Sequence, residues 1–324
     1  RWGGYSSDKG MMGDQFFIAE NPNYGVTFSY YLRDGLKTLK AKRSSNEAKL
    51  LKGNKDTPYP SWDDLRKEAN EEKPSVWLQV KDSNGNDIRR VTAKSGQGLH
   101  RVAWDFRLES INPVEITKPT PSPWGVSPDA PLAVTGEYSV QLMKRENGKV
   151  SSISQPMTFN LTELGVGELI AKDRKALQDF QKQTAKLKSN ISGASKYVKE
   201  MSNRLKHVMK SLDITPLTTD QQDMDARSIL SELSSIKMLL NGDAIKSSAN
   251  EKSPMGLKSR INSIIGGHWD TQASPLAMYK EAFVIAQKQY VVLVEKIRST
   301  DKNLEDLEVH LVNLNAPWTP GRKL

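Results

Sequence analysis

The fold of this chain is decided by residues 168–212, which read ELIAKDRKALQDFQKQTAKLKSNISGASKYVKEMSNRLKHVMKSL. Between positions 177 and 212 the apolar and small residues are separated alternately by three and four positions. This heptad spacing predicts one long helix with a narrow apolar seam. Such a seam is stable only when other helices cover it, so we expect partner helices elsewhere in the chain. The seam positions are Leu177, Phe180, Thr184, Leu187, Ile191, Ala194, Val198, Met201, Leu205, Val208 and Leu212.

The same spacing recurs in two later stretches, residues 226–240 and 276–314. Together with the first stretch they predict an elongated antiparallel helical bundle over residues 164–314, followed by an irregular tail at 315–324. Thr218 or Thr219 can cap the second bundle helix, and Gly242 can end it. The expected long helices cover residues 168–213, 219–241 and 274–314, and a short helix covers 254–265.

The first half of the chain has a different pattern, in which β-branched and aromatic residues alternate with polar ones. Such alternation, with turn residues between the runs, predicts short antiparallel strands. We therefore expect residues 75–163 to form an antiparallel Ig-like β-sandwich. Residues 1–35 would hold the end of a preceding domain and the first sandwich strands, and residues 36–74 a helical insertion with Ser61 as a helix cap. The fold class is α+β and multidomain, with strands at 16–19, 26–32, 76–80, 88–93, 98–105, 136–144 and 153–161.

Composition limits the classes of function. The chain has 324 residues and no cysteine, which excludes disulfides and thiolate chemistry. No apolar run approaches the roughly 18 residues that a membrane span needs. The net charge of +9 raises nucleic acid and anionic surfaces as partners. Residues 168–210 carry 11 Lys or Arg and 4 Asp or Glu, but the lysines surround the polar side of the helix, so nucleic acid is not the favoured partner.

Signatures of catalysis and metal binding do not emerge from the sequence. The histidines lack the spacing of zinc ligands, and no nucleophile motif or converging carboxylate pair is evident. Residues 82–87 superficially match a calcium loop, but glycine is fourth and Ala93 occupies the twelfth position, so we interpret them as a hairpin turn. We expect no cofactor, no metal and no catalytic residue in this chain.

Tryptophans in loops or at helix ends are the remaining candidates for contacts with a partner. Such side chains can stack on sugars or anchor a partner protein, and they can equally close the seam between two domains. The candidate partner or glycan contacts are Trp62, Trp124, Trp269 and Trp318.

Several motifs in their order along the chain resemble a known family. Residues 81–90 read KDSNGNDIRR, residues 98–105 read GLHRVAWD, and residues 136–140 read GEYSV. This series resembles the Ig-like domain of flagellar hook-capping type. Within that class the chain looks most like the C-terminal region of bacterial sortilin-like proteins with Asp-box (BNR) β-propeller repeats, which are often labelled glycosyl hydrolases. Further matching stretches are GDQFF at 13–17, NPNYG at 21–25, YYL at 30–32, PYPSW at 58–62, RIN at 260–262 and APWTPGR at 316–322.

The resemblance implies that a β-propeller precedes Arg1 and that residues 1–35 include its end. It also implies export to the periplasm, cell surface or extracellular space, and it places any hydrolase site in the propeller. The Asp-box pattern itself does not occur in this sequence, so no catalytic residue is carried over. Trp104 and Asp105 are interpreted as architecture: the indole packs between sheets and the carboxylate orders the following turn.

Our leading hypothesis is a non-catalytic interaction and scaffolding C-terminal region of an exported bacterial β-propeller protein, which mediates protein–protein assembly at the cell envelope. Its expected partners are the propeller of the same protein and a protein of an envelope complex, with a glycan as a further ligand. The alternative is the accessory region of a propeller glycoside hydrolase whose active site lies in the N-terminal part. A third hypothesis is an anionic-polymer binder that uses the lysine-rich helix.

Overall fold

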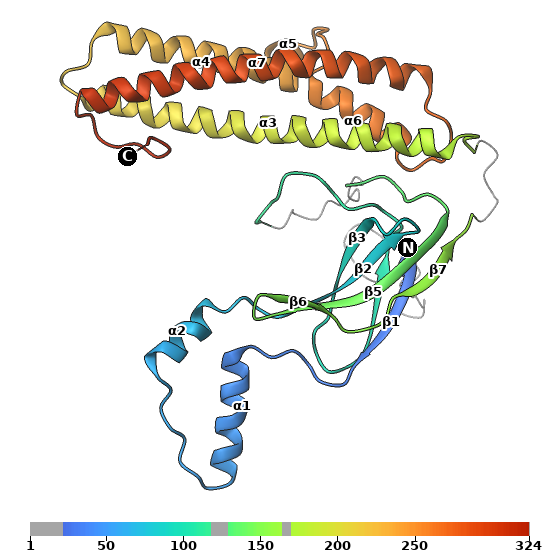
Figure 1. Cartoon of the computed structure of the whole chain (residues 1–324). Helices are drawn as coiled ribbons and strands as arrows, with labels where there is room; N and C mark the ends of the chain where they lie inside the picture. Colours follow the sequence, from blue (N-terminus) through green and yellow to red (C-terminus); the bar gives the residue numbers. More distant parts are fainter. Residues whose placement is uncertain (1–21, 118–128, 164–169, 324) are drawn as a thin grey trace, which may run out of the picture. The chain divides into compact units, whose positions relative to one another are not determined.

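The chain folds into two compact units, one built around β-sheets and one around helices (Figure 1). The computed structural model describes residues 22–117, 129–163 and 170–323. The sheet unit comprises residues 1–109 and 135–163, and the bundle unit comprises residues 110–134 and 164–324. Of the residues that the structure describes, about 49% are helical and 18% are in strands, which confirms the expected antiparallel sheets and long helical region. The strand expected at 16–19 lies outside the described residues.

The sheet unit contains two antiparallel sheets. One has two strands, β1 and β4, and the other has five strands in the order β3-β2-β5-β6, with β7 also paired to β5. Each hydrogen-bonded pair runs antiparallel, as the turn compositions predicted. The strands are β1 (Val26–Leu32), β2 (Ser75–Asp82), β3 (Asp87–Ala93), β4 (Gly98–Trp104), β5 (Gly136–Glu146), β6 (Lys149–Ser152) and β7 (Met157–Leu161).

An aromatic cluster joins the two sheets. Trp104 of β4 is 1% exposed, and its ring centroid lies 5.7 Å from that of Tyr138 in β5 and 6.2 Å from that of Phe159 in β7. The indole N–H donates to the carbonyl of Arg107 at 2.8 Å, and Asp105 Oδ1 accepts from the Arg107 backbone N–H at 3.2 Å. The proposed architectural roles of Trp104 and Asp105 are thus confirmed, because one packs between sheets and the other orders the turn.

The start of β1 approaches this cluster so closely that it requires glycine. Gly25 has φ +117°, and a Cβ atom there would lie 1.9 Å from the carbonyl oxygen of Trp104. A side chain would therefore push β1 away from β4, the strand it pairs with.

The strand predicted at 153–161 begins only at Met157, as β7, and β6 (Lys149–Ser152) is a further strand that the sequence did not predict. Both pair with β5. Pro156 directly precedes β7 and has no N–H to donate to the ladder, which accounts for the late start. The hairpin predicted at 82–87 is confirmed, since Asp82 Oδ1 accepts from the backbone N–H groups of Asn84 and Asn86.

The helical insertion consists of α1 (Leu39–Lys52) and α2 (Trp62–Asn70). Ser61 caps α2 as predicted, because its Oγ accepts from the backbone N–H of Asp64 at 3.1 Å. The two helices are joined by Arg43 of α1, whose Nε lies 2.6 Å from Glu68 Oε1 in α2.

The bundle unit has three legs (Figure 1). The first is α3 (Arg174–Ile214), the second is α4 (Asp220–Asn241) followed in series by α6 (Leu257–His268), and the third is α7 (Ala277–Asn313). A short helix, α5 (Ala244–Ser248), lies in the connection between α4 and α6. Consecutive legs are antiparallel, and α3 and α7 are therefore parallel. Side-chain contacts are consistent with this parallel arrangement. Phe180 packs on Phe283 near the starts of α3 and α7, and the Ser211 hydroxyl donates to the carbonyl of Pro317 near their other ends.

The predicted heptad seam is the core of the bundle. Its positions on α3 are buried, except that Phe180 and Ala194 are partly buried against the same cluster.

The ends of the helices follow from their capping residues. Thr219 precedes α4, its N–H donates to Gln222 Oε1 at 2.8 Å, and Gly242 ends that helix. The first helix begins later than expected because the Asp173 side chain caps it, accepting from the backbone N–H of Ala176. Within the described residues, none of the helices combines the length and apolar character that crossing a membrane would require.

The second leg is interrupted where two glycines meet. A Cβ atom on Gly256, just before α6, would lie 2.3 Å from the backbone nitrogen of Gly242. The end of α4 and the start of α6 can therefore approach this closely only because residue 256 has no side chain.

The described residues 110–117 and 129–134 belong to the bundle unit, whereas we expected them within the range of the sandwich, residues 75–163. Contacts with α3 explain the difference. The Lys196 ammonium donates to the carbonyls of Pro113 and Val114 at 3.3 and 3.1 Å and pairs with Glu115 at 2.8 Å. The Ser189 hydroxyl donates to the carbonyl of Ile111.

Candidate functional site

Trp62 is the most exposed of the candidate tryptophans that the structure describes. It is the first residue of α2 and is 69% exposed. Its ring centroid lies 6.2 Å from that of Tyr59, which is 77% exposed, in an edge-to-face arrangement. The pair presents two aromatic faces to solvent, which suits stacking on a sugar or on an apolar side chain.

Trp269 is a core residue. It follows α6 directly, is 0% exposed and belongs to the buried cluster of the bundle. The Lys188 ammonium lies 5.2 Å from its ring centroid. Since solvent does not reach Trp269, this structure offers it no contact with a partner or glycan. Trp124 lies outside the described residues.

Trp318 lies in the tail that follows α7 and is 56% exposed. The tail is tied to itself and to α3. The Trp318 indole N–H donates to the carbonyl of Arg322 at 3.2 Å, and the Ser211 hydroxyl donates to the carbonyl of Pro317 at 3.1 Å. Trp62 belongs to the sheet unit and Trp318 to the bundle unit, so neither unit gathers two exposed candidate tryptophans among its described residues.

A charged cluster links the two parallel legs of the bundle. The Arg204 guanidinium of α3 contacts Glu308 of α7 at 2.7 and 3.2 Å and Asp301 at 3.2 Å. The Tyr197 hydroxyl donates to Asp301 Oδ2 at 2.5 Å, and this hydrogen bond, with burial, raises the pKa of Tyr197 to about 12. Because the carboxylates are held by cation and hydroxyl partners, the cluster is a structural clamp.

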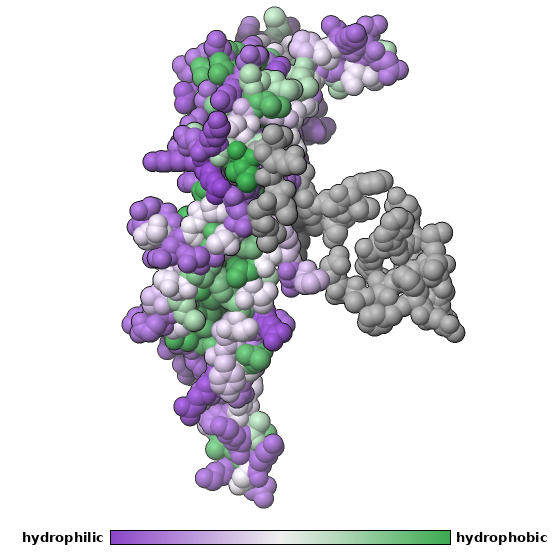
Figure 2. All heavy atoms as spheres, turned by 90° about the vertical axis from the view of Figure 1, so that its right-hand side faces the viewer, coloured by the Kyte–Doolittle hydropathy of each residue, from purple (hydrophilic) through white to green (hydrophobic). Residues whose placement is uncertain are grey.

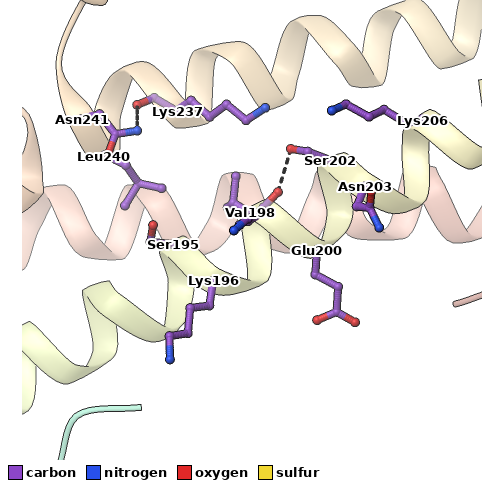
Figure 3. A pocket seen from close by; sticks show the side chains of 11 residues that line it. Ser195, Lys196, Val198, Glu200, Ser202, Asn203, Lys206, Lys237, Leu240 and Asn241 are labelled. Atoms are coloured by element: carbon purple, nitrogen blue, oxygen red, sulfur yellow. Dashed lines mark hydrogen bonds between the residues drawn. The ribbon is translucent and has the colours of Figure 1, made fainter. Parts of the chain in front are cut away.

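A concavity of the bundle unit lies between α3 and α4, beside the interruption of the second leg (Figure 3). We call it the lysine groove. Its volume is about 680 Å³, within the range of small-ligand sites. The lining residues are Ser195, Lys196, Val198, Lys199, Glu200, Ser202, Asn203 and Lys206 from α3, and Lys237, Leu240 and Asn241 from α4.

Positive charge faces the inside of the lysine groove. Figure 3 shows the ammonium groups of Lys206 and Lys237 extending toward one another from the two helices, with Ser202 between them. Neither ammonium has a carboxylate within ion-pair distance among the described residues. Figure 3 also shows Glu200 and Lys196 pointing away, and Lys196 is paired with Glu115 instead.

A second concavity, of about 620 Å³, lies in the sheet unit around the ends of β1 and β5. Its carboxylate, Glu146, accepts from Lys42 at 2.9 Å and from Lys144 at 3.2 Å. The hydrogen bond from Lys42 is the main reason that the pKa of Glu146 lies below its usual value. A carboxylate held ionised in this way does not serve as a general acid near neutral pH.

Metal coordination is not assembled in the regions that the structure describes, where no three His, Cys, Asp or Glu side chains converge. Two features of the described residues suit binding: the exposed aromatic pair in the sheet unit and the ammonium groups of the lysine groove in the bundle unit.

The lysine groove was not predicted from the sequence. Lysines on the first bundle helix were interpreted as spread over its polar side, and α4 carries its lysine, Lys237, near its end. The relevant signal is Lys199, Ser202 and Lys206, spaced by three and four positions and therefore on one face of α3. That signal becomes a site only when the antiparallel pairing of α3 with α4 brings Lys237 opposite.

Comparison with known proteins finds no matching family model, no matching curated protein and no matching solved structure.

Proposed function

We propose that this chain is a non-catalytic interaction and scaffolding region of an exported bacterial β-propeller protein, which assembles with a protein partner at the cell envelope. In this proposal the sheet unit is an Ig-like sandwich of the hook-capping type, and the propeller precedes it. The motif series GLHRVAWD and GEYSV supports the proposal, together with the roles of Trp104 and Asp105 in packing and turn formation.

The observation that carries the interaction role is the outer face of α7. Met278, Ile285 and Val292 repeat every seven residues along it and are 62%, 44% and 48% exposed. Val284 and Val291 form a second exposed row, 48% and 57% accessible. The opposite side of the same helix is buried in the bundle, so these rows are held on a rigid support.

Charges between the two rows specify the kind of partner. Glu281, Lys288 and Glu295 follow the same seven-residue spacing, and none has an ion-pair partner among the described residues. A helix of another protein with apolar residues at heptad spacing and a complementary order of charges would cover this face. Figure 2 shows hydrophobic residues in patches among hydrophilic ones on one face of the molecule. The regular spacing along α7 distinguishes its two rows from apolar residues that are exposed singly.

The test begins with capture of proteins from the envelope fraction by the tagged chain, followed by purification of the main captured protein. Its affinity is then measured for the wild type, for Ile285→Glu/Val292→Glu, and for a control, Leu217→Glu/Met224→Glu. The control makes the same apolar-to-acidic exchange at residues that are 65% and 63% exposed elsewhere in the bundle unit. We expect the α7 variant to lose about tenfold or more in affinity and the control to bind normally. Equal binding by both variants would refute the proposal.

The alternative function, an accessory region of a propeller glycoside hydrolase, is favoured by the exposed pair of Tyr59 and Trp62. Two accessible rings close together suit a sugar platform. This alternative predicts glycosidase activity in the longer protein that disappears when the propeller is removed. It also predicts that Trp62→Ala weakens binding to oligosaccharide substrates, whereas Trp318→Ala does not.

A further inference from the structure

Two ammonium groups directed at one another across a groove offer a place for a counter-charge. Lys206 and Lys237 face each other across the lysine groove (Figure 3), and no described carboxylate pairs with either. Lys199 is exposed on the same side of α3, so a third positive charge borders the groove. Like charges that border one groove repel, and an anion placed between them would replace that repulsion by charge-assisted hydrogen bonds.

Neutral hydrogen-bond donors also line the lysine groove. The Ser202 hydroxyl lies between the two ammonium groups and donates to the carbonyl of Val198 at 2.7 Å, but a hydroxyl can rotate to another acceptor. The Asn241 amide donates to the carbonyl of Lys237 at 3.1 Å, which leaves one of its two N–H groups for a ligand. Several donors around one space match an anion with several oxygen atoms.

The charge pattern of α4 limits the size of the ligand. The start of that helix is acidic, with Asp220, Asp223 and Asp225 in its first turns. The start of α4 lies beside the end of α3 because the two helices are antiparallel and joined by a short turn. A long polyanion that followed α3 past Lys206 would therefore meet carboxylates, whereas a small anion would stay between the lysines.

We propose that the lysine groove binds a small multivalent oxyanion, with Lys206 and Lys237 as its principal ligands and Lys199 and Ser202 in support. Phosphate and sulfate esters share this chemistry. The proposal is independent of the interaction role assigned to α7, because it rests on a different pair of helices and on charge rather than apolar area.

Isothermal titration calorimetry of the full chain with inorganic tripolyphosphate, at low salt, tests the proposal. The groove variant is Lys206→Gln/Lys237→Gln, and the control is Lys182→Gln/Lys186→Gln, which removes the same charge from exposed lysines elsewhere on α3. We expect the groove variant to lose about tenfold or more in affinity, while the control changes by about twofold or less. Lys206→Arg/Lys237→Arg should retain binding because it keeps both charges.

Sulfate and a single-stranded oligonucleotide distinguish the remaining outcomes. Competition of inorganic sulfate with tripolyphosphate supports a site for oxyanions in general. Absence of tripolyphosphate binding to the wild type would overturn the proposal, as would equal losses in the groove and control variants. The proposal would also be overturned if an oligonucleotide bound more tightly than tripolyphosphate and the control variant weakened that binding. The lysines along α3 would then form an extended nucleic-acid-binding surface.

Discussion

In the bundle unit, buried side chains recur every three or four residues along helices of up to 41 residues, whereas the core of the sheet unit gathers single rings from β1, β4, β5 and β7. The bundle spreads its stability over many aliphatic contacts of similar size. The sheet unit combines buried aliphatic residues of β2 and β5, such as Val80 and Leu142, with an aromatic cluster whose rings are far apart in sequence. Loss of the central ring of that cluster should therefore damage the sheet unit more than a single substitution in the seam damages the bundle unit.

The largest effect is expected from Trp104→Ala. The change removes the ring that contacts both Tyr138 and Phe159 and leaves the carbonyl of Arg107 without its indole donor. The loss for a buried tryptophan is about 3 to 5 kcal/mol, which approaches the total stability of a small unit. Hydrogen exchange should show lost protection in β4, β5 and β7, with protection retained in α3. Trp62→Ala, at an exposed ring, is the control and should change the stability little.

A smaller effect, and a sharper comparison, comes from one arginine in each unit. Arg204→Met in the bundle unit would strand Glu308, whose side chain is 6% exposed, and we expect a loss of about 2 to 3 kcal/mol. Arg43→Met in the sheet unit removes contacts to Glu47 and Glu68, but between more accessible helices, so its effect should be smaller. Chemical denaturation of both variants checks the order. Restoration of stability in Arg204→Met/Glu308→Met would show that the stranded charge is the cause.

The difference between the units also explains what the sequence could predict. Heptad spacing is local, so the seam from Leu177 to Leu212 and the helix ends at Thr219 and Gly242 follow from neighbouring residues. The late start of the last strand after Pro156 is equally local, and the prediction missed it although proline has no N–H to donate. The association of residues 111–115 with α3 depends on contacts such as that of Lys196 with Val114, which no periodicity encodes.

Sites depend still more on pairing between distant residues. In the sequence, Trp269 and Trp318 each follow a helix, yet Trp269 is buried and Trp318 is 56% exposed. Only tertiary packing separates them. The lysine groove likewise needs Lys206 and Lys237 on facing helices. A count of charges along one helix therefore predicts a positive surface but not the position of the groove.

The smallest expected effect concerns His268, at the end of α6. The ring is 1% exposed, neither ring nitrogen has a hydrogen-bond partner, and Phe180 and Tyr279 pack around it. Burial therefore lowers the pKa of His268 below its ordinary value. Between these two pKa values the unfolded chain binds a proton that the folded chain does not, so the free energy of unfolding falls as the pH falls through about 6.5.

His268→Leu should remove this pH dependence. The leucine leaves no unsatisfied nitrogen in the bundle core, so stability at pH about 7.5 should be nearly unchanged, while the decline toward pH about 5.5 should become shallower. His310→Gln, at an exposed position of α7, provides the matched control and should keep the slope of the wild type. Thermal melts across this pH window measure both. A slope that stays the same in His268→Leu would contradict this prediction, because the buried ring would then not be the source of the acid sensitivity.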